Sequence, residues 1–250
     1  MRLIVFTDLD GTLLDHDTYD FSPALPAIDA LREQGIPLIL ASSKTGAEIA
    51  EIRSRIGVED WPAIVENGAG ELAPGCEPST DSSDYRKLRV LLNQLPAILR
   101  ARFRGFGDMT VADIVDVTGL SPESAELARQ RAYTEPGLFS GNDEEKKRFC
   151  TLLEEQGVSS RDGGRFLTLP FGRTKADGLR RIAERFGVQK TIALGDAPND
   201  RDMLLAASQA VVIRNEHAPD MGDIPGALYT RTSGPIAWNE AVLALLDSPA

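Results

Sequence analysis

The chain alternates between short, continuously apolar segments and longer segments in which apolar residues recur at helical spacing. The first apolar segment, LIVFT at 3–7, is rich in β-branched residues and is followed by Asp and Gly. A run of this kind is typical of a strand that is buried on both faces of a sheet. Similar segments follow later, namely IPLILAS at 36–42, PAIVENGA at 62–69, KTIALGD at 190–196 and AVVIR at 210–214. In the second of these a turn is predicted at Asn67 and Gly68.

Helices are predicted between these strands, and local signals mark the ends of two of them. Ser22 followed by Pro23 has the form of an N-cap and a first helical residue, and Gly35 ends that helix. Thr45 and Glu48 form an S/T-x-x-E capping box that opens the next one. The predicted helices in this part of the chain are 22–34, 45–56, 175–186, 199–207 and 235–247. Alternation of apolar strands with helices predicts a doubly wound α/β core, in which helices cover both faces of a parallel sheet.

The middle of the chain has a different pattern. Residues 74–84 (PGCEPSTDSSD) form a polar junction rich in proline and serine. Beyond it, helices are predicted at 84–101, 110–117, 122–131 and 143–156, and strands at 102–106, 132–139 and 165–169. This order predicts an α+β domain inserted between the two halves of the core. The predicted core therefore comprises 1–82 and 172–250, and the inserted domain comprises 83–171.

Net charge, cysteine spacing and the lengths of apolar runs indicate which partners and which cellular compartment to expect. The 250 residues carry a formal net charge of −11, which argues against binding to nucleic acid or to an anionic membrane surface. A phosphorylated substrate would have to be held by local cations against this overall charge. Cys76 and Cys150 lie far apart without metal-ligand spacing, and no apolar run has the length of a signal segment or a membrane span. We therefore expect a reduced, cytoplasmic protein, a monomer or homodimer, that acts on a small molecule.

Acidic side chains follow two of the predicted core strands. Asp8 and Asp10 come after the first strand, and alternation along an extended chain directs both to one side. Asp196 and Asp200 stand at the end of a later strand. Ligands of parallel α/β sheets bind beyond the carboxyl ends of the strands, so these four acids are expected to converge. Carboxylate oxygens suit Mg²⁺, although an Asp-Gly turn or a helix-capping loop would account for either pair alone.

Side chains able to hold a phosphoryl group occur at the same predicted edge. Ser42 ends the second strand and precedes a helix whose backbone N–H groups would bind phosphate oxygens, with Ser43 and Lys44 beside it. Lys175 opens a later helix, where its charge opposes the helix dipole unless an anion lies nearby. Thr12 can hydrogen-bond a loop or an oxyanion. Ordinary helix-entry or surface chemistry is the alternative for each of these residues.

Taken in order, these motifs resemble those of the haloacid-dehalogenase-like phosphatases. They are D-x-D-G-T at 8–12, a serine at the end of the second strand, Lys175, and G-D-x-x-N-D at 195–200. The resemblance implies a Rossmann-like core with the larger, Cof-type α+β cap. It also implies a Mg²⁺-dependent phosphomonoesterase that works through an aspartyl-phosphate, with Asp8 as nucleophile and Asp10 as general acid and base.

The same resemblance assigns the residues that bind the metal and the phosphoryl group. The implied ligands of Mg²⁺ are Asp8, the backbone carbonyl of Asp10, Asp196 and, in a supporting position, Asp200. Ser42 and Lys175 are implied to hold the phosphoryl group.

A closer resemblance is to mannosyl-3-phosphoglycerate phosphatases. It rests on the segments VFTDLDGTLLDHDTYDF, SSKTGAEI, IVENGA, RAYTEPGLFSG and GGRFLTL. It implies hydrolysis of mannosyl-3-phosphoglycerate to mannosylglycerate and phosphate. In the inserted domain, Arg131 and Arg165 are candidates to pair with the substrate carboxylate, and Glu135 is a candidate to accept hydrogen bonds from sugar hydroxyls. The remaining candidates for substrate contact are Gly164, Asn67 and Asn199.

Other functions are compatible with the same core residues. A broad-specificity sugar-phosphate phosphatase or a glucosyl-3-phosphoglycerate phosphatase would need the same acids and lysine. A phosphomutase would use the same aspartate pair but return the phosphoryl group to the substrate. A non-catalytic binding module is disfavoured, because none of the catalytic acids is missing. His16 and His217 are isolated in the sequence and are expected to bind no metal.

Overall fold

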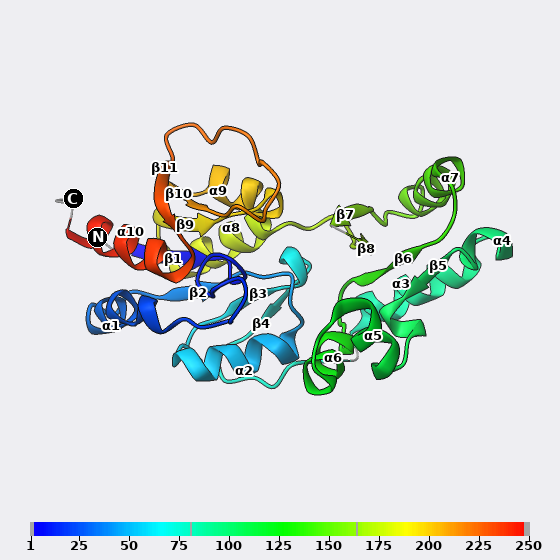
Figure 1. Ribbon diagram of the computed structural model, residues 1–250, viewed down its shortest axis with the longest axis horizontal. Coiled ribbons are helices and arrows are strands. Elements are labelled where there is room, and N and C mark those ends of the chain that lie inside the picture. Colours follow the sequence, from blue (N-terminus) through cyan, green and yellow to red (C-terminus); the bar gives the residue numbers. More distant parts are fainter. Residues whose placement is uncertain (1–2, 81, 164, 248–250) are drawn as a thin grey trace. The chain divides into compact units, whose positions relative to one another are not determined.

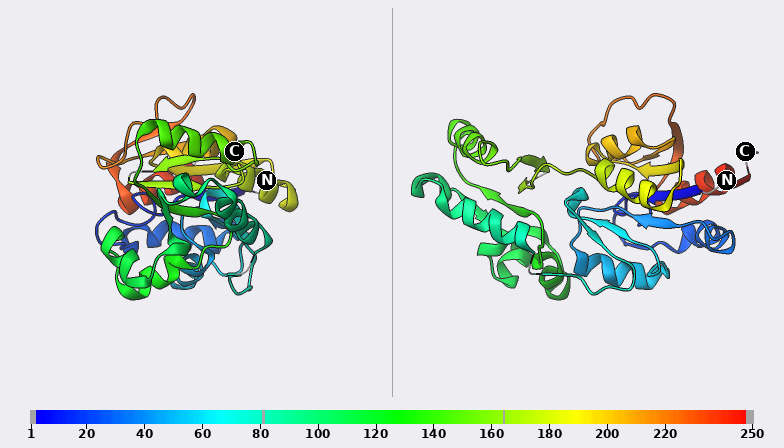
Figure 2. Two further views of the ribbon diagram at one scale, coloured as in Figure 1. Left: turned by 90° about the vertical axis from the view of Figure 1, so that its right-hand side faces the viewer. Right: turned by 180° about the vertical axis from the view of Figure 1, so that it is seen from behind.

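The computed structural model describes residues 3–80, 82–163 and 165–247. The chain divides into two compact units, whose elements are labelled in Figure 1 and seen from two further sides in Figure 2. The first unit comprises residues 1–43, 53–75 and 174–250, and the second comprises 44–52 and 76–173. Each unit has its own sheet and its own hydrophobic core.

The first unit is built on a five-stranded parallel sheet in the order β11-β10-β9-β1-β2. Its strands are β1 Leu3–Thr7, β2 Leu38–Leu40, β9 Lys190–Gly195, β10 Gln209–Arg214 and β11 Leu228–Ser233. β1 lies between β2 and β9, with Val5 beside Leu38 and Leu3 beside Lys190. Because β1 is an interior strand and is parallel to both neighbours, the residues that follow it lie at the carboxyl edge of the sheet. The predicted parallel α/β core is confirmed.

Helices pack against both faces of this sheet. They are α1 Leu25–Glu33, α8 Lys175–Phe186, α9 Arg201–Ala206 and α10 Gly234–Asp247, with 3-10 turns η1 Ser22–Ala24, η2 Glu66–Gly68 and η4 Pro198–Asp200. The helix α2 Gly46–Ile56 is divided between the two units, because its residues up to 52 belong to the second. Phe6 of β1 packs in one core with Leu179 of α8 and Met203 of α9. Its neighbour Thr7 points to the other face, where its hydroxyl accepts a hydrogen bond from the indole N–H of Trp238 in α10 at 2.9 Å. The alternation of side chains along β1 therefore ties the sheet to both helix layers.

The third predicted strand differs from the expectation. β3 Ala63–Val65 pairs antiparallel with β4 Gly70–Leu72, and it meets the main sheet at the isolated bridge between Ala41 and Ile64. The predicted turn at Asn67 and Gly68 is present as η2. Three consecutive residues there have positive φ angles, 50° at Glu66, 58° at Asn67 and 93° at Gly68. This sharp reversal sends the chain back as β4 instead of into a helix.

Two helices of the pattern begin or end differently in the structure. Ser22 is the first residue of the 3-10 turn η1 and does not cap α1, which begins at Leu25. Pro26 has no N–H to donate to the carbonyl of Ser22, so the first turn is a 3-10 turn. The helix predicted over 84–101 is two helices, α3 Ser83–Gln94 and α4 Ala97–Arg100, separated at Pro96.

The second unit is an α+β fold around an antiparallel four-stranded sheet in the order β5-β6-β8-β7. Its strands are β5 Phe103–Gly105, β6 Glu135–Phe139, β7 Arg161–Gly163 and β8 Phe166–Leu169, with the 3-10 turn η3 Phe106–Asp108. Besides α3 and α4 it contains α5 Val111–Thr118, α6 Pro122–Arg129 and α7 Asp143–Glu154. The predicted inserted α+β cap is confirmed as a fold class. Within the part of the chain that the structure describes, no helix is long and apolar enough to cross a membrane.

Candidate active site

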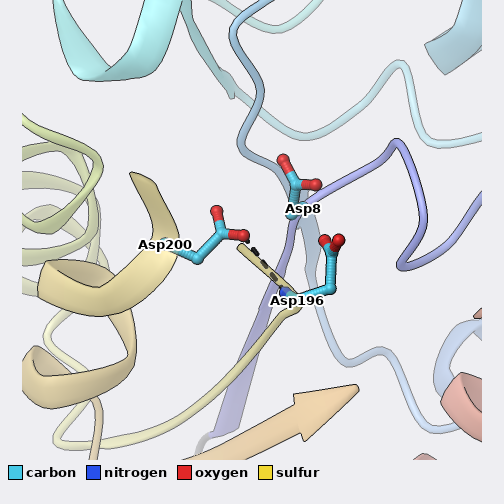
Figure 3. A group of neighbouring side chains, drawn as sticks. All are labelled: Asp8, Asp196 and Asp200. Carbon is cyan, nitrogen blue, oxygen red and sulfur yellow. Dashed lines mark hydrogen bonds between the residues drawn. The ribbon is translucent and has the colours of Figure 1, made fainter. Parts of the chain in front are cut away.

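Three aspartates from two strand ends converge in the first unit. Asp8 directly follows β1, Asp196 follows β9, and Asp200 ends the 3-10 turn after β9. All three are buried, and one carboxylate oxygen from each lies within 4.8 Å of the others. Figure 3 shows the three side chains gathered beyond the sheet edge. Three buried carboxylates repel one another, so the cluster needs cationic partners.

Lys175 is the cation that the structure supplies. It is the first residue of α8, only 1% exposed, and its Nζ donates to Asp8 Oδ1 at 2.5 Å and to Asp200 Oδ1 at 2.6 Å. Burial lowers the pKa of Lys175, but the attraction of the two carboxylates outweighs this and raises the pKa above its ordinary value. The lysine is therefore held as a buried ammonium between the two acids.

The pKa of Asp8 has several causes. Burial raises this pKa well above its ordinary value, and the neighbouring charge of Asp200 raises it further. Lys175 lowers it, while Asp196 and Asp10 raise it. A divalent cation among these carboxylates would lower the pKa of Asp8 and keep the side chain ionised.

Asp196 is fixed by two hydrogen bonds. Its Oδ1 accepts from the hydroxyl of Thr12 and its Oδ2 from the amide of Asn215, both at 2.6 Å. Burial raises the pKa of Asp196, and these two hydrogen bonds oppose the rise. Gly11 has a φ of 80°, and a Cβ there would lie 2.5 Å from Asn215 Nδ2 and 2.9 Å from Asp196 Oδ2. Glycine at position 11 therefore permits both the turn and the close approach of the asparagine.

Asp200 has a double role in the local structure. One of its oxygens accepts from Lys175, while Oδ2 accepts from the backbone N–H groups of Asp196 and Ala197 at 3.2 Å each. The second set of bonds folds the loop after β9 so that the carboxylates of Asp196 and Asp200 lie on the same side. The oxygen-only donor set of three carboxylates fits a hard divalent cation such as Mg²⁺, which prefers such ligands.

Asp10, Ser42 and Ser43 lie in the first unit, shortly after the ends of β1 and β2. Asp10 and Ser43 line the same cavity as Asp8 and Asp196. Ser42 follows the end of β2 and is buried; its backbone N–H donates to the carbonyl of Ile64, and its carbonyl accepts from the N–H of Asn67. Lys44 begins the segment 44–52, which belongs to the second unit, and it is half-buried. The predicted catalytic and phosphate-binding roles of these residues stay predictions.

The two asparagines predicted to contact substrate are hydrogen-bonded to each other. Asn199, in η4, donates from Nδ2 to Asn67 Oδ1 at 3.2 Å. Asn67 lies in the positive-φ turn η2, and Gly68 of that turn packs against the backbone of Thr174, so a Cβ at position 68 would overlap it. The turn after β3 is thus fitted against the start of α8, which carries Lys175.

A cavity of about 230 Å³ opens beside the cluster. Its lining residues are Asp8, Asp10, His16, Ser43, Asp196, Ala197, Asn199, Asn215, His217, Ala218 and Pro219. Asn215 is not among the site residues predicted from the sequence, and no role was predicted for the two histidines. Asn215 comes directly after β10, so the strand-end rule that found the aspartates would also have found it.

The candidate residues of the second unit lie in three separate environments. Arg131 is buried and donates from Nη2 to the hydroxyl of Thr134 at 2.6 Å. Arg165 is exposed and donates from Nη1 to the carbonyl of Val117 at 2.6 Å. Glu135 belongs to a buried network, and Gly164 lies outside the described residues.

Both oxygens of Glu135 have partners within the second unit. Oε1 accepts from the backbone N–H of Gly107 at 2.8 Å, and Oε2 accepts from the hydroxyl of Tyr85 at 2.5 Å. The side chain is fully buried, and burial raises its pKa above the ordinary value despite these hydrogen bonds. These hydrogen bonds hold Tyr85 and the turn at Gly107, and the predicted contact of Glu135 with a sugar stays a prediction.

Comparison with known proteins defines the class. The sequence model of the haloacid dehalogenase-like hydrolase family matches residues 1–208, and the chain belongs to this family. The chain is also similar to glucosyl-3-phosphoglycerate/mannosyl-3-phosphoglycerate phosphatases. The protein of that name from Persephonella marina is 33% identical over 98% of this chain and 97% of its own length. That from Methanococcoides burtonii is 32% identical over 98% of both chains.

The fold is shared with solved structures. A hypothetical protein from Geobacillus kaustophilus superposes with a TM-score of 0.70 at 20% identity, covering 98% of this chain and 100% of its own. The predicted family and fold class are therefore confirmed. The predicted enzyme class is confirmed as well: the protein is a phosphoric monoester hydrolase.

Proposed function

We propose that this hydrolase is a Mg²⁺-dependent phosphatase of glycosyl-3-phosphoglycerates, with mannosyl-3-phosphoglycerate as its substrate. The observation that carries the proposal is the buried cluster of Asp8, Asp196 and Asp200 with Lys175 at its centre. Similarity along nearly the whole chain to relatives with the phosphatase names given above supports the substrate class.

The metal would be held by Asp8, Asp196, Asp200 and the backbone carbonyl of Asp10. These are hard oxygen donors at two neighbouring strand ends, and the carboxylates are already within 4.8 Å of one another. When bound, Mg²⁺ supplies Lewis-acid polarisation of the phosphoryl oxygens.

The chemistry would proceed in two steps on Asp8. Its carboxylate oxygen attacks phosphorus, the ester P–O bond breaks, and Asp10 donates a proton to the leaving alkoxide, which departs as the alcohol. Water then attacks the aspartyl-phosphate, and Asp10, now a carboxylate, takes the proton from that water. Inorganic phosphate leaves and both aspartates return to their starting states.

Other core residues would position the phosphoryl group. Lys175 offers an ammonium beside Asp8 and would offset the charge of the phosphoryl oxygens. Ser42, Ser43 and Lys44 would donate to the same oxygens from the chain that follows β2. Thr12 is predicted to contact substrate, and its bond to Asp196 also gives it a part in orienting a metal ligand.

The inserted domain, residues 83–171, would select the alcohol part of the substrate. Arg131 and Arg165 are the candidates for binding the glycerate carboxylate, because guanidinium groups pair with carboxylates in bidentate geometry. Asn67 and Asn199, in the core, are the further polar candidates for substrate contact.

A phosphate-release screen with and without Mg²⁺ tests the proposal. We expect kcat/KM for mannosyl-3-phosphoglycerate to be at least about 100-fold above that for hexose phosphates, because the proposed substrate contacts include both the sugar and the carboxylate. Asp8→Asn is expected to abolish release while the far-ultraviolet dichroism is unchanged. Substantial Mg²⁺-dependent turnover by this variant would refute the mechanism, and equal rates on simple hexose phosphates would refute the substrate.

A second candidate substrate is glucosyl-3-phosphoglycerate. The names of both relatives include this sugar, so the screen must contain both esters. Comparable kcat/KM values on the two would identify an enzyme that does not discriminate the sugar epimers. Release of free phosphate, as opposed to its transfer within the substrate, distinguishes a phosphatase from a phosphomutase.

A further inference from the structure

His16 and His217, the two histidines of the chain, lie face to face at the cavity beside Asp8. Their ring centroids are 4.6 Å apart and their planes differ by 7°. The residues are 201 positions apart in sequence (217 minus 16), so only the fold brings them together. Their separation in the sequence gave no indication that the two rings stack.

The loops that carry the pair are each held by hydrogen bonds, and that of His217 is linked to Asp196. The backbone N–H of His217 donates to Asn215 Oδ1 at 2.9 Å, and the amide of the same asparagine donates to Asp196 at 2.6 Å. On the other side, Asp15 accepts from the N–H and the hydroxyl of Thr18 and forms a compact turn that contains His16. The two rings are thus held on supported loops and need little ordering when a ligand binds.

The pair supplies chemistry that the rest of the cavity lacks. Among the described residues that line the cavity, His16 and His217 are the side chains able to carry positive charge, and the other titratable ones are aspartates. The amides of Asn199 and Asn215 each already donate to a protein acceptor. An imidazole keeps at least one N–H donor whether neutral or protonated, and no imidazole hydrogen bond is present within the described part of the chain.

We propose that His16 and His217 together bind the carboxylate of a phosphorylated hydroxy acid whose phosphoryl group lies at Asp8. The inference rests on the proposed phosphatase function, and it assigns the substrate carboxylate to this histidine pair of the first unit in place of Arg131 and Arg165. The cavity of about 230 Å³ has room for a three-carbon phosphohydroxy acid, since one water occupies about 30 Å³ in the liquid. Two imidazole N–H groups at one wall would receive the carboxylate away from the repelling aspartates.

Because the chain has two histidines, nuclear magnetic resonance can observe the site directly. The imidazole signals, assigned with His16→Gln, are followed in the Mg²⁺-loaded Asp8→Asn protein, which does not consume the ligand. The matched ligands are 3-phosphoglycerate and glycerol 3-phosphate, which carries a hydroxymethyl group in place of the carboxylate. We expect 3-phosphoglycerate to shift both imidazole signals and glycerol 3-phosphate to shift them at least about five-fold less. Equal shifts with the two ligands, or no shift with millimolar 3-phosphoglycerate, would overturn the proposal.

Kinetics of His16→Gln and His217→Gln provide a second test. For 3-phosphoglycerate, KM is expected to rise about ten-fold in each variant, while kcat stays within about two-fold of its value in the unmodified protein. For glycerol 3-phosphate, neither constant should change. Glu216→Gln is the control, because this residue neighbours His217, pairs with Arg214 and is absent from the cavity lining. Equal losses on both esters would indicate a structural part and refute the inference.

The two proposals fail in different ways. Selective imidazole shifts without phosphate release from any ester would refute the phosphatase proposal and leave the carboxylate site standing. Phosphate release together with equal imidazole shifts for both ligands would refute the carboxylate site and leave the phosphatase proposal standing.

Discussion

The most unusual residue of the active site is Lys175. A lysine at the first position of a helix opposes the helix dipole, and a fully buried lysine loses its hydration. Both penalties are offset here because the ammonium lies between Asp8 and Asp200, at 2.5 and 2.6 Å. The position of this lysine at the start of a predicted helix indicated that it needed an anionic partner, and the structure identifies the two partners.

Replacing Lys175 with methionine tests this balance. Lys175→Met leaves two buried carboxylates without their cation, so we expect a loss of about 3–5 kcal/mol in the free energy of unfolding, measured by urea denaturation. Phosphate release should fall at least about 100-fold, since a donor beside the reacting phosphoryl group is lost.

Lys146→Met is the matched control. This lysine pairs with Asp162 on the surface of the second unit, so its replacement should cost less than about 1 kcal/mol. Equal stability losses for the two variants would contradict the buried ion-pair account.

At the scale of elements, α8 determines where Lys175 lies. Thr174 and Asp177 form a capping box, in which the Thr174 hydroxyl accepts from the N–H of Asp177 and Asp177 accepts from the N–H of Thr174. This cap fixes the start of the helix at Lys175. One turn on, Gly178 lets α8 lie directly on Ile64 of β3, since a Cβ at this position would be 2.7 Å from the Ile64 Cδ1 atom.

The substitution Gly178→Ala tests this close packing. Alanine is the better helix former, but its methyl group would overlap Ile64, so we expect destabilisation by about 1–3 kcal/mol in place of a gain. Activity should fall too, because α8 would move with Lys175 at its start. The measurements are urea denaturation and phosphate release.

Two further variants provide a rescue and a control. Ile64→Val combined with Gly178→Ala removes the Cδ1 methyl and should restore part of the lost stability. Glu184→Ala, on the exposed side of the same helix, should change stability by less than about 0.5 kcal/mol. A stabilised Gly178→Ala protein would show that the contact is not limiting.

Some helices and strands could be predicted from the hydrophobic pattern of the sequence, and others could not. α8 and β1 begin and end at the predicted residues, because continuous apolar runs and strong end signals act locally. β11 was missed since LYTRTS is largely exposed at the sheet edge and carries no apolar run. β3 and the turn after it were predicted, but its antiparallel partner β4 was not, because β4 has only three residues and carries no apolar run.

At the scale of the whole molecule, three buried aspartates lie together at one sheet edge in a chain whose formal net charge is already −11. Bringing these acids together costs free energy, and one lysine offsets only part of it. A ligand that binds the folded state alone stabilises it in proportion to its occupancy. The protein should therefore be most stable with a divalent cation bound.

Thermal unfolding with and without Mg²⁺ tests this expectation. At about 100 times the dissociation constant, binding contributes about 2.7 kcal/mol, which raises Tm by about 5–10 °C for a protein of this size. Asp196→Asn should lose most of this shift, whereas Asp202→Asn, an exposed acid in α9, should keep it. Potassium chloride at equal ionic strength controls for screening. A shift that persists in Asp196→Asn would place the cation elsewhere.

The sequence by itself determined the alternating α/β core, the inserted α+β segment and the acids at the strand ends, because these depend on local periodicity and on the rule that parallel strands share a carboxyl edge. Tertiary structure alone decided which side chains meet across long separations. Examples are Asn215 with Asp196 and the stacked rings of His16 and His217. Such contacts depend on how loops fold back over the sheet edge, and loop conformation leaves no periodic signal in the sequence.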